Sequence, residues 1–383
     1  MPALPRILVR VLMIAGVVVV TALAASPALA QVTPAAGHTP PDDTPTVKVG
    51  GTIYADFTYT DKPTSVDADG NVIHPSSFDI RRAYINVTGT ITHLVSFRIT
   101  PDVGPHLTTT ASGLPTGARF STNLDGSLTV RLKYGYGQIN FDDFLTKGSW
   151  LRIGLQQTPY LDYTEGIYRY RFQGTIFPER EGFFGSDSSD FGISAHYNLP
   201  GNYGDFHLGV YNGDTYTKPD PNDQKAFEVR GSLRPFPLGG NLKGLRVTAF
   251  YKADSVVKDA ARNRFIGSVS YEHTYVVTGF EYLDARDRAS ATKPEVHADG
   301  WSVWAMPRSK IGLEGFFRYD SLKPNKDVDG RRNRTIVGGA YWFRTQASPA
   351  AAALLLDYEQ VKNDSALSRP DEKRVSLHCL FNF

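Results

Sequence analysis

Apolar and polar residues alternate with a period of two in short segments that run from Thr46 to Phe383. This period places successive side chains on opposite faces of a β-strand, and no segment shows a convincing amphipathic helix. The pattern predicts about 16 strands, at residues 46–60, 78–91, 93–102, 127–140, 149–158, 190–199, 203–212, 226–236, 243–253, 263–272, 274–283, 299–306, 310–320, 332–344, 352–362 and 372–383.

The predicted connections between these strands alternate between short and long. Short connections lie at Thr92, Pro200–Asn202 and Pro307–Ser309. Long connections cover residues 61–77, 103–126, 159–189, 213–225 and 284–298. Outer-membrane barrels have short periplasmic turns and longer external loops. The sequence therefore predicts an all-β fold, a transmembrane antiparallel β-barrel at residues 46–383. A secreted β-sandwich is the alternative, but it gives no reason for the alternation.

Charged residues within the strands indicate which face of the barrel meets lipid. A cation on the lipid face costs about 2–4 kcal/mol at the middle of the bilayer. In the segment 128–136 this cost predicts that Arg131 and Lys133 face the lumen. The opposite, lipid-facing set is then Leu128, Val130, Leu132, Tyr134 and Tyr136.

The same test, applied to the other strands, predicts a lumen lined mainly by basic residues. The acidic residues that it assigns to the lumen are fewer: Glu228, Glu314, Asp357 and Glu359. A charged interior needs water, and a barrel of about 16 strands leaves an aqueous channel. We therefore expect passive diffusion of small hydrophilic solutes with a preference for anions. The predicted pore-lining residues are Arg82, Arg98, Arg131, Lys133, Arg152, Arg230, Arg234, Arg246, Arg318 and Arg374.

The two ends of the sequence carry patterns typical of export and of outer-membrane assembly. Residues 1–30 have a basic start, an apolar stretch and the small-residue pattern Ala28-Leu29-Ala30, which predicts a signal peptide cleaved after Ala30. Residues 31–45 are rich in proline and predict a flexible leader. The last strand alternates and ends on Phe383, as in bacterial outer-membrane barrels. We therefore expect the bacterial outer membrane as the location and its lipids as partners.

Composition and motifs exclude several other classes of function. The net charge of +2 gives no support for nucleic-acid binding, and the single Cys379 excludes an intramolecular disulfide. The nine His are scattered without ligand spacing, and no G-x-S-x-G, H-E-x-x-H or P-loop motif is present. Residues 67–71 resemble a calcium loop but lack its terminal Glu. We therefore expect no enzymatic activity, cofactor or metal.

Two parts of the chain resemble the phosphate-selective porin O/P family. Residues 78–90, FDIRRAYINVTGT, and the following Val95-Ser96-Phe97-Arg98 resemble two early strands of that family. Residues 152–192, from RIGLQQTP through EREGFF to DFG, resemble its middle section. The resemblance implies an anion-preferring porin that forms a homotrimer and whose long third loop folds into the channel.

The third long connection, residues 159–189, is the predicted constriction. Structureless loops longer than about 12–15 residues are uncommon and are usually functional. This one could fold into the pore, or it could lie over the mouth or against a neighbouring subunit. We expect the inward position, with Arg98, Arg131 and Arg152 on the facing wall. The predicted constriction residues are Asp162, Glu165, Tyr168, Arg169, Arg171, Glu179, Arg180 and Glu181.

Three alternatives to a diffusive pore stay open from the sequence. A substrate-selective channel for phosphate or a sugar would use the tyrosine-rich loop as a stacking track. A non-transporting structural or adhesin barrel would need no open lumen. A barrel-borne hydrolase would need a Ser/His or Asp/His pair, and no such pair is identifiable. Single-channel conductance separates the two transporters from the other two classes.

Overall fold

A computed structural model describes residues 43–105, 128–184, 188–216, 222–343 and 351–383. The predicted signal peptide at 1–30, and all of the predicted leader except residues 43–45, lie outside the described residues. The same applies to most of the second long connection, 103–126.

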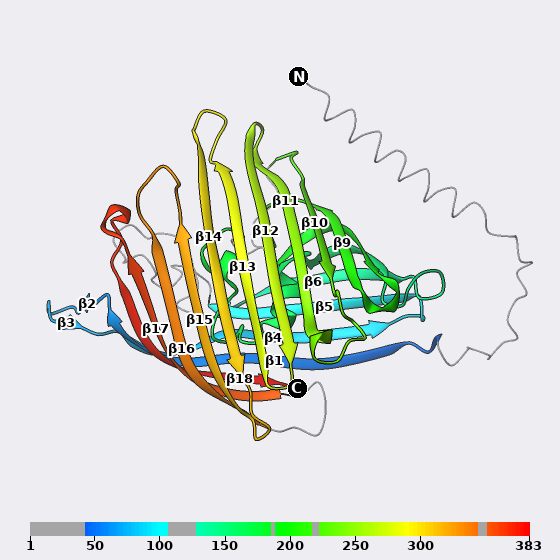
Figure 1. Cartoon of the computed structure of the whole chain (residues 1–383), viewed down its shortest axis with the longest axis horizontal. Coiled ribbons are helices and arrows are strands. Elements are labelled where there is room, and N and C mark those ends of the chain that lie inside the picture. The colour runs from blue at the N-terminus through cyan, green and yellow to red at the C-terminus, as the bar shows by residue number, and fades with distance from the viewer. Residues whose placement is uncertain (1–42, 106–127, 185–187, 217–221, 344–350) are drawn as a thin grey trace, which may run out of the picture. The chain divides into compact units, whose positions relative to one another are not determined.

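Sixteen strands close into one antiparallel barrel, as the sequence predicts (Figure 1). Each strand pairs with its neighbour in the chain, and the first strand closes the barrel against the last. The strands are β1 (Thr46–Lys62), β4 (Ser76–Thr90), β5 (Val95–Pro105), β6 (Leu128–Asn140), β7 (Trp150–Gln157), β8 (Ser189–Asn198), β9 (Gly204–Tyr211), β10 (Ala226–Leu233), β11 (Leu245–Val257), β12 (Ala260–His273), β13 (Val276–Arg288), β14 (Glu295–Pro307), β15 (Leu313–Lys323), β16 (Arg332–Phe343), β17 (Ala351–Asn363) and β18 (Glu372–Asn382).

The strands β11 to β14 extend further than the sequence predicts. β11 and β12 are joined only by residues 258–259, and β13 and β14 only by residues 289–294. The added segments carry charged residues, which on their own are typical of loops. In the barrel these residues pair across neighbouring strands: Arg262 Nε donates to Asp254 Oδ2 at 2.7 Å. The predicted bounds of the long connection, 284–298, are therefore wrong, because the connection covers only residues 289–294.

Two of the predicted long connections contain regular structure. The hairpin β2 (Ser65–Val66) and β3 (Val72–Ile73) lies within the connection 61–77. Within the connection 159–189 lie two short helices, α2 (Leu161–Ile167) and α3 (Phe177–Arg180). Both helices are too short to produce a helical period in the sequence, and α3 depends on Pro178 at its start. The expectation that no helix interrupts the strands is therefore wrong.

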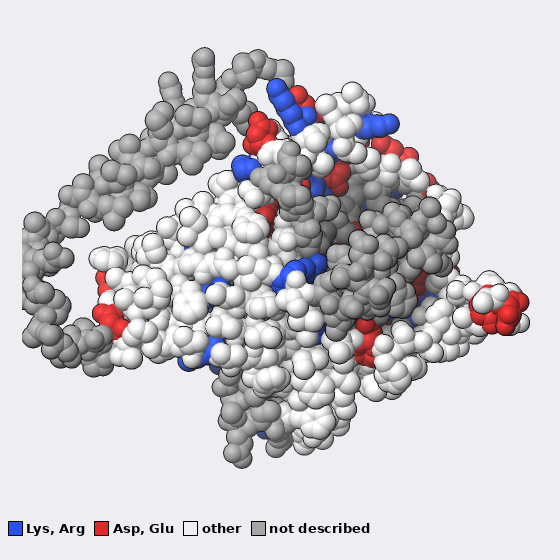
Figure 2. Space-filling view, turned by 180° about the vertical axis from the view of Figure 1, so that it is seen from behind, with Lys and Arg blue, Asp and Glu red and all other residues white. Residues whose placement is uncertain are grey.

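Exposed apolar side chains cover the outside of the barrel. On β16, Val337 and Tyr341 are 50% and 40% exposed, whereas Arg334 and Ile336, on the opposite face of the strand, are 3% and 0% exposed. Figure 2 shows broad stretches of uncharged surface on one face, with a smaller number of charged side chains among them. Soluble monomers rarely expose such continuous apolar surface. The outer face therefore has the character of a lipid-facing belt.

No helix among the described residues is long and apolar enough to span a bilayer.

A β-bulge in β6 reverses the predicted orientation of two tyrosines. Thr100 pairs with Tyr134, but Pro101 pairs with Leu132, so Lys133 is the extra residue. Lys133 and Tyr134 are both buried inside, at 3% and 7% exposure. Beyond the bulge, Tyr136 lies under the guanidinium of an inward arginine, so it also faces inward. The prediction that Tyr134 and Tyr136 face lipid is wrong, because a bulge shifts a period of two by one residue.

A second bulge brings two consecutive arginines to the inner face of β4. Tyr54 pairs with Arg82 and Ala55 pairs with Ile80, which leaves Arg81 between them. Arg81 forms an ion pair with the inward Asp56, while Arg82 forms one with Asp102. Strict alternation had assigned only Arg82 to the lumen.

The barrel has two unlike ends, and we call one of them the short-turn rim. It carries the connections 91–94, 141–149, 199–203, 234–244, 274–275 and 308–312, together with the start of β1 and the end of β18. His93 links three parts of this rim. Its ring nitrogens lie 2.6 Å from Oδ1 of Asp43, which precedes β1, and 3.0 Å from Oδ2 of Asp143 in the connection 141–149. The predicted constriction loop begins and ends at the opposite end, which we call the long-loop rim.

Candidate pore wall and constriction

Six basic side chains lie on the inner faces of four consecutive strands, β4 to β7, and we call this surface the basic wall. Five of them were predicted from the sequence, and the bulge in β4 adds the sixth. They are Arg81, Arg82, Arg98, Arg131, Lys133 and Arg152.

Aromatic rings, together with neutral polar groups, support the basic wall. The guanidinium carbon of Arg98 lies 4.4 Å from the centre of the Tyr134 ring, and that of Arg152 lies 3.7 Å from Trp150. Contacts of this kind stabilise a cation without cancelling its charge. Further pairs place Lys133 at 4.4 Å from Tyr84 and Arg131 at 4.9 Å from Tyr216.

One acid that was not among the predicted lining residues lies within the basic wall. Asp102 is fully buried, and its Oδ2 lies 3.1 Å from Arg82 Nη1 and 3.4 Å from Arg131 Nε. The signal was present, because Arg98, Thr100 and Asp102 alternate on β5. One carboxylate against two guanidiniums leaves this part of the wall positive.

The third long connection packs its aromatic side chains against strands β14 to β16. The ring centres of Tyr170 and Phe316 are 4.7 Å apart, and those of Tyr168 and Trp304 are 5.5 Å apart. The indole nitrogen of Trp342 donates to the Tyr170 hydroxyl at 3.1 Å. These strand residues alternate with exposed apolar ones, so the loop contacts the inner face of this wall.

Ion pairs join the same loop to strands β15, β16 and β17, and Arg374 of β18 pairs in turn with Glu359 of β17. We call the strands β15 to β18 the covered wall. Arg180 Nη2 lies 2.5 Å from Glu359 Oε2, and Glu181 Oε1 accepts from Arg334 Nη2 at 2.7 Å. The guanidinium of Arg318 donates to the Thr175 carbonyl oxygen at 2.7 Å. The predicted loop residues and the predicted wall residues therefore meet, with their charges paired.

The predicted lining residues fall into three groups rather than one ladder. The first is the basic wall, where Arg82 and Arg131 keep 31% and 41% of their side chains exposed. The second lies against the loop or its ion pairs: Arg230, Arg318 and Arg374. The third, Arg234 and Arg246, lies at the short-turn rim.

The predicted set of lumen acids, Glu228, Glu314, Asp357 and Glu359, is incomplete. Further carboxylates lie buried on the inner faces of strands, and most of them pair with the arginines or lysines beside them. Alternation with apolar residues did not identify them, because several lie where the strands extend into predicted loops or next to a bulge. The missed buried acids include Asp56, Asp102, Asp254, Glu281 and Asp320, and the partly buried Asp205, which pairs with Arg230, was missed as well.

The charges of the loop itself are mostly paired. We call the side of the loop that carries the exposed Asp162 its open side. Arg171 forms ion pairs with Glu165 and Glu179. Asp162 of α2 is exposed and lies close enough to Arg152 to interact electrostatically. This interaction connects the loop with Arg152 of the basic wall.

Among the residues that the structure describes, no group of three or more His, Cys, Asp or Glu side chains could hold a metal ion.

A closed 16-strand barrel with an apolar outer belt and a charged interior defines an outer-membrane channel of the porin class. Residues 47–275 match the family model described as phosphate-selective porin O and P, and the chain belongs to this family. The resemblance seen in the early strands is thereby confirmed. A search of curated proteins finds no match to the chain.

Solved structures with the same fold are distant in sequence. An anion-selective porin from Comamonas acidovorans superposes with a TM-score of 0.60 at 12% identity, covering 88% of this chain and 100% of that one. A loop-deletion mutant of OmpT from Vibrio cholerae gives 0.58 at 13% identity, covering 89% and 100%. The channel DcaP of Acinetobacter baumannii gives 0.57 at 11% identity, covering 88% and 97%. At these identities the likeness shows the fold.

Proposed function

We propose that this chain is a passive diffusion pore of the bacterial outer membrane that prefers small anions. The observation that carries the proposal is the unequal pairing of the inward cations. Those of the covered wall are buried with carboxylates, whereas Arg98 and Arg152 of the basic wall bond to neutral groups. A surface with an excess of cations beside water raises the local concentration of anions. The Comamonas porin, which shares the fold, is itself described as anion-selective.

We place the constriction between the basic wall and the open side of the third loop. Three contacts support this position. The loop packs along the covered wall. The ring centres of Phe172 in the loop and Tyr54 on β1 are 6.5 Å apart. Asp162 of the loop interacts electrostatically with Arg152. Screening limits the reach of a charge to about 8–10 Å at physiological salt. The charges on the two sides of this gap therefore dominate selectivity.

The proposal also covers how the chain is exported and assembled. We infer cleavage after Ala30, insertion among outer-membrane lipids and assembly into a homotrimer. One solved OmpT structure from Vibrio cholerae, with a TM-score of 0.55 at 13% identity and coverage of 89% and 100%, is described as a trimer form. Crosslinking in native membranes should give a three-subunit species, and a monomer alone would contradict the homotrimer.

Planar-bilayer recording of the purified protein tests the anion preference directly. With potassium chloride at two concentrations across the membrane, the reversal potential should have the sign set by chloride. A reversal potential set by potassium would overturn the proposal. Absence of single-channel conductance from heat-modifiable, folded protein would instead favour a structural or adhesin barrel.

A substrate-selective channel is the second candidate, favoured by the aromatic rings along the basic wall. Tyr84, Tyr134 and Trp150 line the same surface as the cations. Such a surface could hold a solute by stacking as well as by charge. Saturable block of the chloride current by phosphate or a sugar would support selectivity, and a strictly linear response would support diffusion alone.

A further inference from the structure

The connections of the short-turn rim expose apolar side chains at their tips. Each of the six connections that define this rim carries at least one exposed large apolar side chain. The most exposed are Leu238 at 85%, Phe144 at 76% and Ile311 at 61%, which lie on three different connections. We call these three residues the apolar tips. Turns that project into water are ordinarily built from small and polar residues, so the apolar tips indicate a contact with something other than water.

The opposite rim does not share this character. The hairpin β2–β3 is the exception there, with Val66 and Val72 exposed. Among the described residues of the long-loop rim, Val328, at 37%, is the only exposed large apolar side chain on four other connections, 258–259, 289–294, 324–331 and 364–371. Two rims that both faced water would be similarly polar. The difference therefore indicates that the short-turn rim has another surrounding.

The apolar tips lie next to the end of the lipid-facing belt. Each of their connections adjoins a strand whose terminal outward residue is itself apolar and exposed. These residues are Ile139 of β6 at 46%, Leu233 of β10 at 51% and Leu313 of β15 at 52%. The belt and the apolar tips are thus separated by only a few residues of chain. A membrane that covers the belt to the ends of these strands can therefore reach the tips.

Hydrogen bonds within the connections hold the apolar tips in their exposed positions. Between β6 and β7, the Leu145 backbone nitrogen donates to the Phe141 carbonyl oxygen at 2.7 Å. Between β14 and β15, the Ser309 backbone nitrogen donates to the Leu313 carbonyl oxygen at 2.8 Å. The tips are therefore presented by formed turns and are not folded back onto the barrel.

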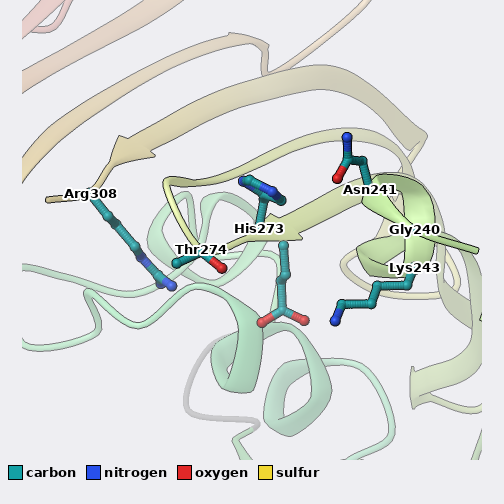
Figure 3. A pocket seen from close by; sticks show the side chains of 7 residues that line it. Gly240, Asn241, Lys243, His273, Thr274 and Arg308 are labelled. Atoms are coloured by element: carbon teal, nitrogen blue, oxygen red, sulfur yellow. The ribbon is translucent and has the colours of Figure 1, made fainter. Parts of the chain in front are cut away.

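Polar side chains of the same rim gather in a pocket that excludes the apolar tips. Figure 3 shows Lys243 and Arg308 directed toward a shared space between three connections, with Asn241 and Thr274 beside it. None of the residues that line this pocket is an exposed large apolar one. The rim thus has separate polar and apolar parts, as is typical of a surface at the boundary between water and lipid.

We propose that the short-turn rim is anchored in the inner leaflet of the outer membrane, with its apolar tips inserted at the boundary between headgroups and acyl chains. A lipid surface fits because exposed apolar residues occur on all six connections, whereas a protein partner would need them gathered into one patch. Lys147, Lys243 and Lys310 lie close in sequence to exposed apolar residues. Their stems can extend along lipid while their ammonium groups stay in water. The inference rests on the proposed function only in that the barrel lies in the outer membrane.

Such anchoring fixes the height of the barrel in the membrane. A strand needs about 9–11 residues to cross the bilayer. The strands β11 and β12 have 13 and 14 residues, and β13 and β14 have 13 each. With the short-turn rim level with the inner-leaflet headgroups, the excess length lies at the long-loop rim. The hairpins of these strands, at the top of Figure 1, then project beyond the external surface.

Site-directed spin labelling in liposomes tests the anchoring. The background is Cys379→Ala, which removes the single cysteine of the chain. Single cysteines for the label are then introduced as Phe144→Cys, Leu238→Cys or Ile311→Cys. The purified protein is reconstituted in phosphatidylethanolamine with a minority of phosphatidylglycerol. Collision with oxygen, which concentrates in the bilayer, and with a water-soluble nickel chelate gives the depth of each label. We expect all three labels about 5–10 Å into the headgroup and acyl-chain boundary.

Two exposed positions outside the apolar tips serve as matched controls. Asn241→Cys lies on the same connection as Leu238 but lines the pocket, and Ala291→Cys lies on the connection between β13 and β14 at the opposite rim. Both labels should collide with the nickel chelate far more than with oxygen. If the labels on the apolar tips are as accessible to the chelate as these two, the tips stand in water and the proposal is overturned.

A stability measurement covers the case in which a label disturbs its own turn. The variant F144S/L238S/I311S should lower the thermal midpoint of heat-modifiable migration in the same liposomes, because it places polar side chains in lipid. The variant V66S/V72S/V328S changes three exposed apolar residues of the long-loop rim and should leave the midpoint unchanged. Equal shifts in the two triple variants would contradict the anchoring.

Planar-bilayer recording of the wild type separates this proposal from the proposed function. Apolar tips in lipid together with a reversal potential set by potassium would refute the anion preference and leave the anchoring standing. Apolar tips in water on a pore that selects chloride would refute the anchoring and leave the anion preference standing.

Discussion

The two walls of the barrel use the same residue type to opposite effect. On the covered wall, Arg318 is completely buried and bonds to Asp320 at 2.8 Å, and Arg334 pairs with Glu181 and Glu359. On the basic wall, Arg98 donates to the Asn86 amide oxygen at 2.9 Å and to the Thr100 hydroxyl at 3.0 Å. Both sets face inward, but the arginines of the covered wall are neutralised by acids, whereas Arg98 and Arg152 of the basic wall are held by neutral groups.

The arginines of the covered wall therefore have a structural role, whereas those of the basic wall act through their electric field. A buried charge is stable only when it is paired and hydrogen-bonded, so the covered wall needs its acids to hold the loop. A cation at a water-filled lumen is solvated and needs no acid. Its field then acts on passing ions. The number of inward arginines is therefore a poor measure of selectivity, and their partners are a better one.

The largest effect is expected from removing the central acid of the covered wall. Glu359 is 2% exposed and lies 2.5 Å from Arg180 and 2.6 Å from Arg374. Glu359→Gln leaves buried guanidiniums uncompensated and should lower the free energy of unfolding by about 3–5 kcal/mol. Urea unfolding in detergent, followed by tryptophan fluorescence, measures it, since Trp304 and Trp342 pack against the loop.

A more exposed acid of the same wall serves as the matched control. Glu372, 31% exposed in its side chain, lies 3.0 Å from Arg332. Glu372→Gln should lower the free energy of unfolding by less than about 1 kcal/mol, as for exposed ion pairs. Equal effects of the two substitutions would mean that the covered wall does not depend on its buried pairing.

The next effect concerns selectivity and comes from the basic wall. Replacing Arg98, Arg131 and Arg152 together by Gln keeps hydrogen-bonding groups and removes three charges. The chloride-to-potassium permeability ratio should fall by about threefold or more, because these charges lie within a screening length of the proposed constriction. Reversal potentials in a potassium chloride gradient measure it, and conductance should persist.

Two comparisons make this prediction specific to the wall. The triple variant K258Q/R286Q/K362Q removes three exposed cations outside the lumen and should leave the reversal potential unchanged. Asp102→Asn should act in the opposite direction, because it frees Arg82 and Arg131 from their shared acid. An unchanged reversal potential in the Arg98, Arg131 and Arg152 variant would place the selectivity elsewhere than on the basic wall.

The smallest effect lies at the short-turn rim, outside both walls. Hydrogen bonds that the His93 ring donates to the carboxylates of Asp43 and Asp143 raise the pKa of His93 above its ordinary value of 6.5. The stability from this charged form is complete below about pH 6.5 and is lost as the pH rises through the raised pKa. The thermal midpoint of heat-modifiable migration should therefore fall slightly above that pH. His93→Asn should remove this part of the pH dependence, and an identical pH profile in the variant would contradict it.

The amino-acid sequence by itself determined the class of fold and the orientation of most strands. A period of two is a local property of an extended chain, and the cost of a cation in lipid decides which face is outside. Positions such as Arg98, Arg131 and Arg152 were therefore predictable one strand at a time. The family was also predictable, because the motif at 78–90 resembles one of its strands and lies within the segment 47–275 that matches the family model.

Only the tertiary structure decided which of these cations stay electrically available. The bulges at Arg81 and Lys133 arise from pairing between strands, and a local period cannot reveal where an extra residue is accommodated. The loop covers Arg318 through contacts that join residues far apart in the chain. Charge compensation and burial depend on such neighbours, so identical arginines in similar strands become structural on one wall and electrostatic on the other.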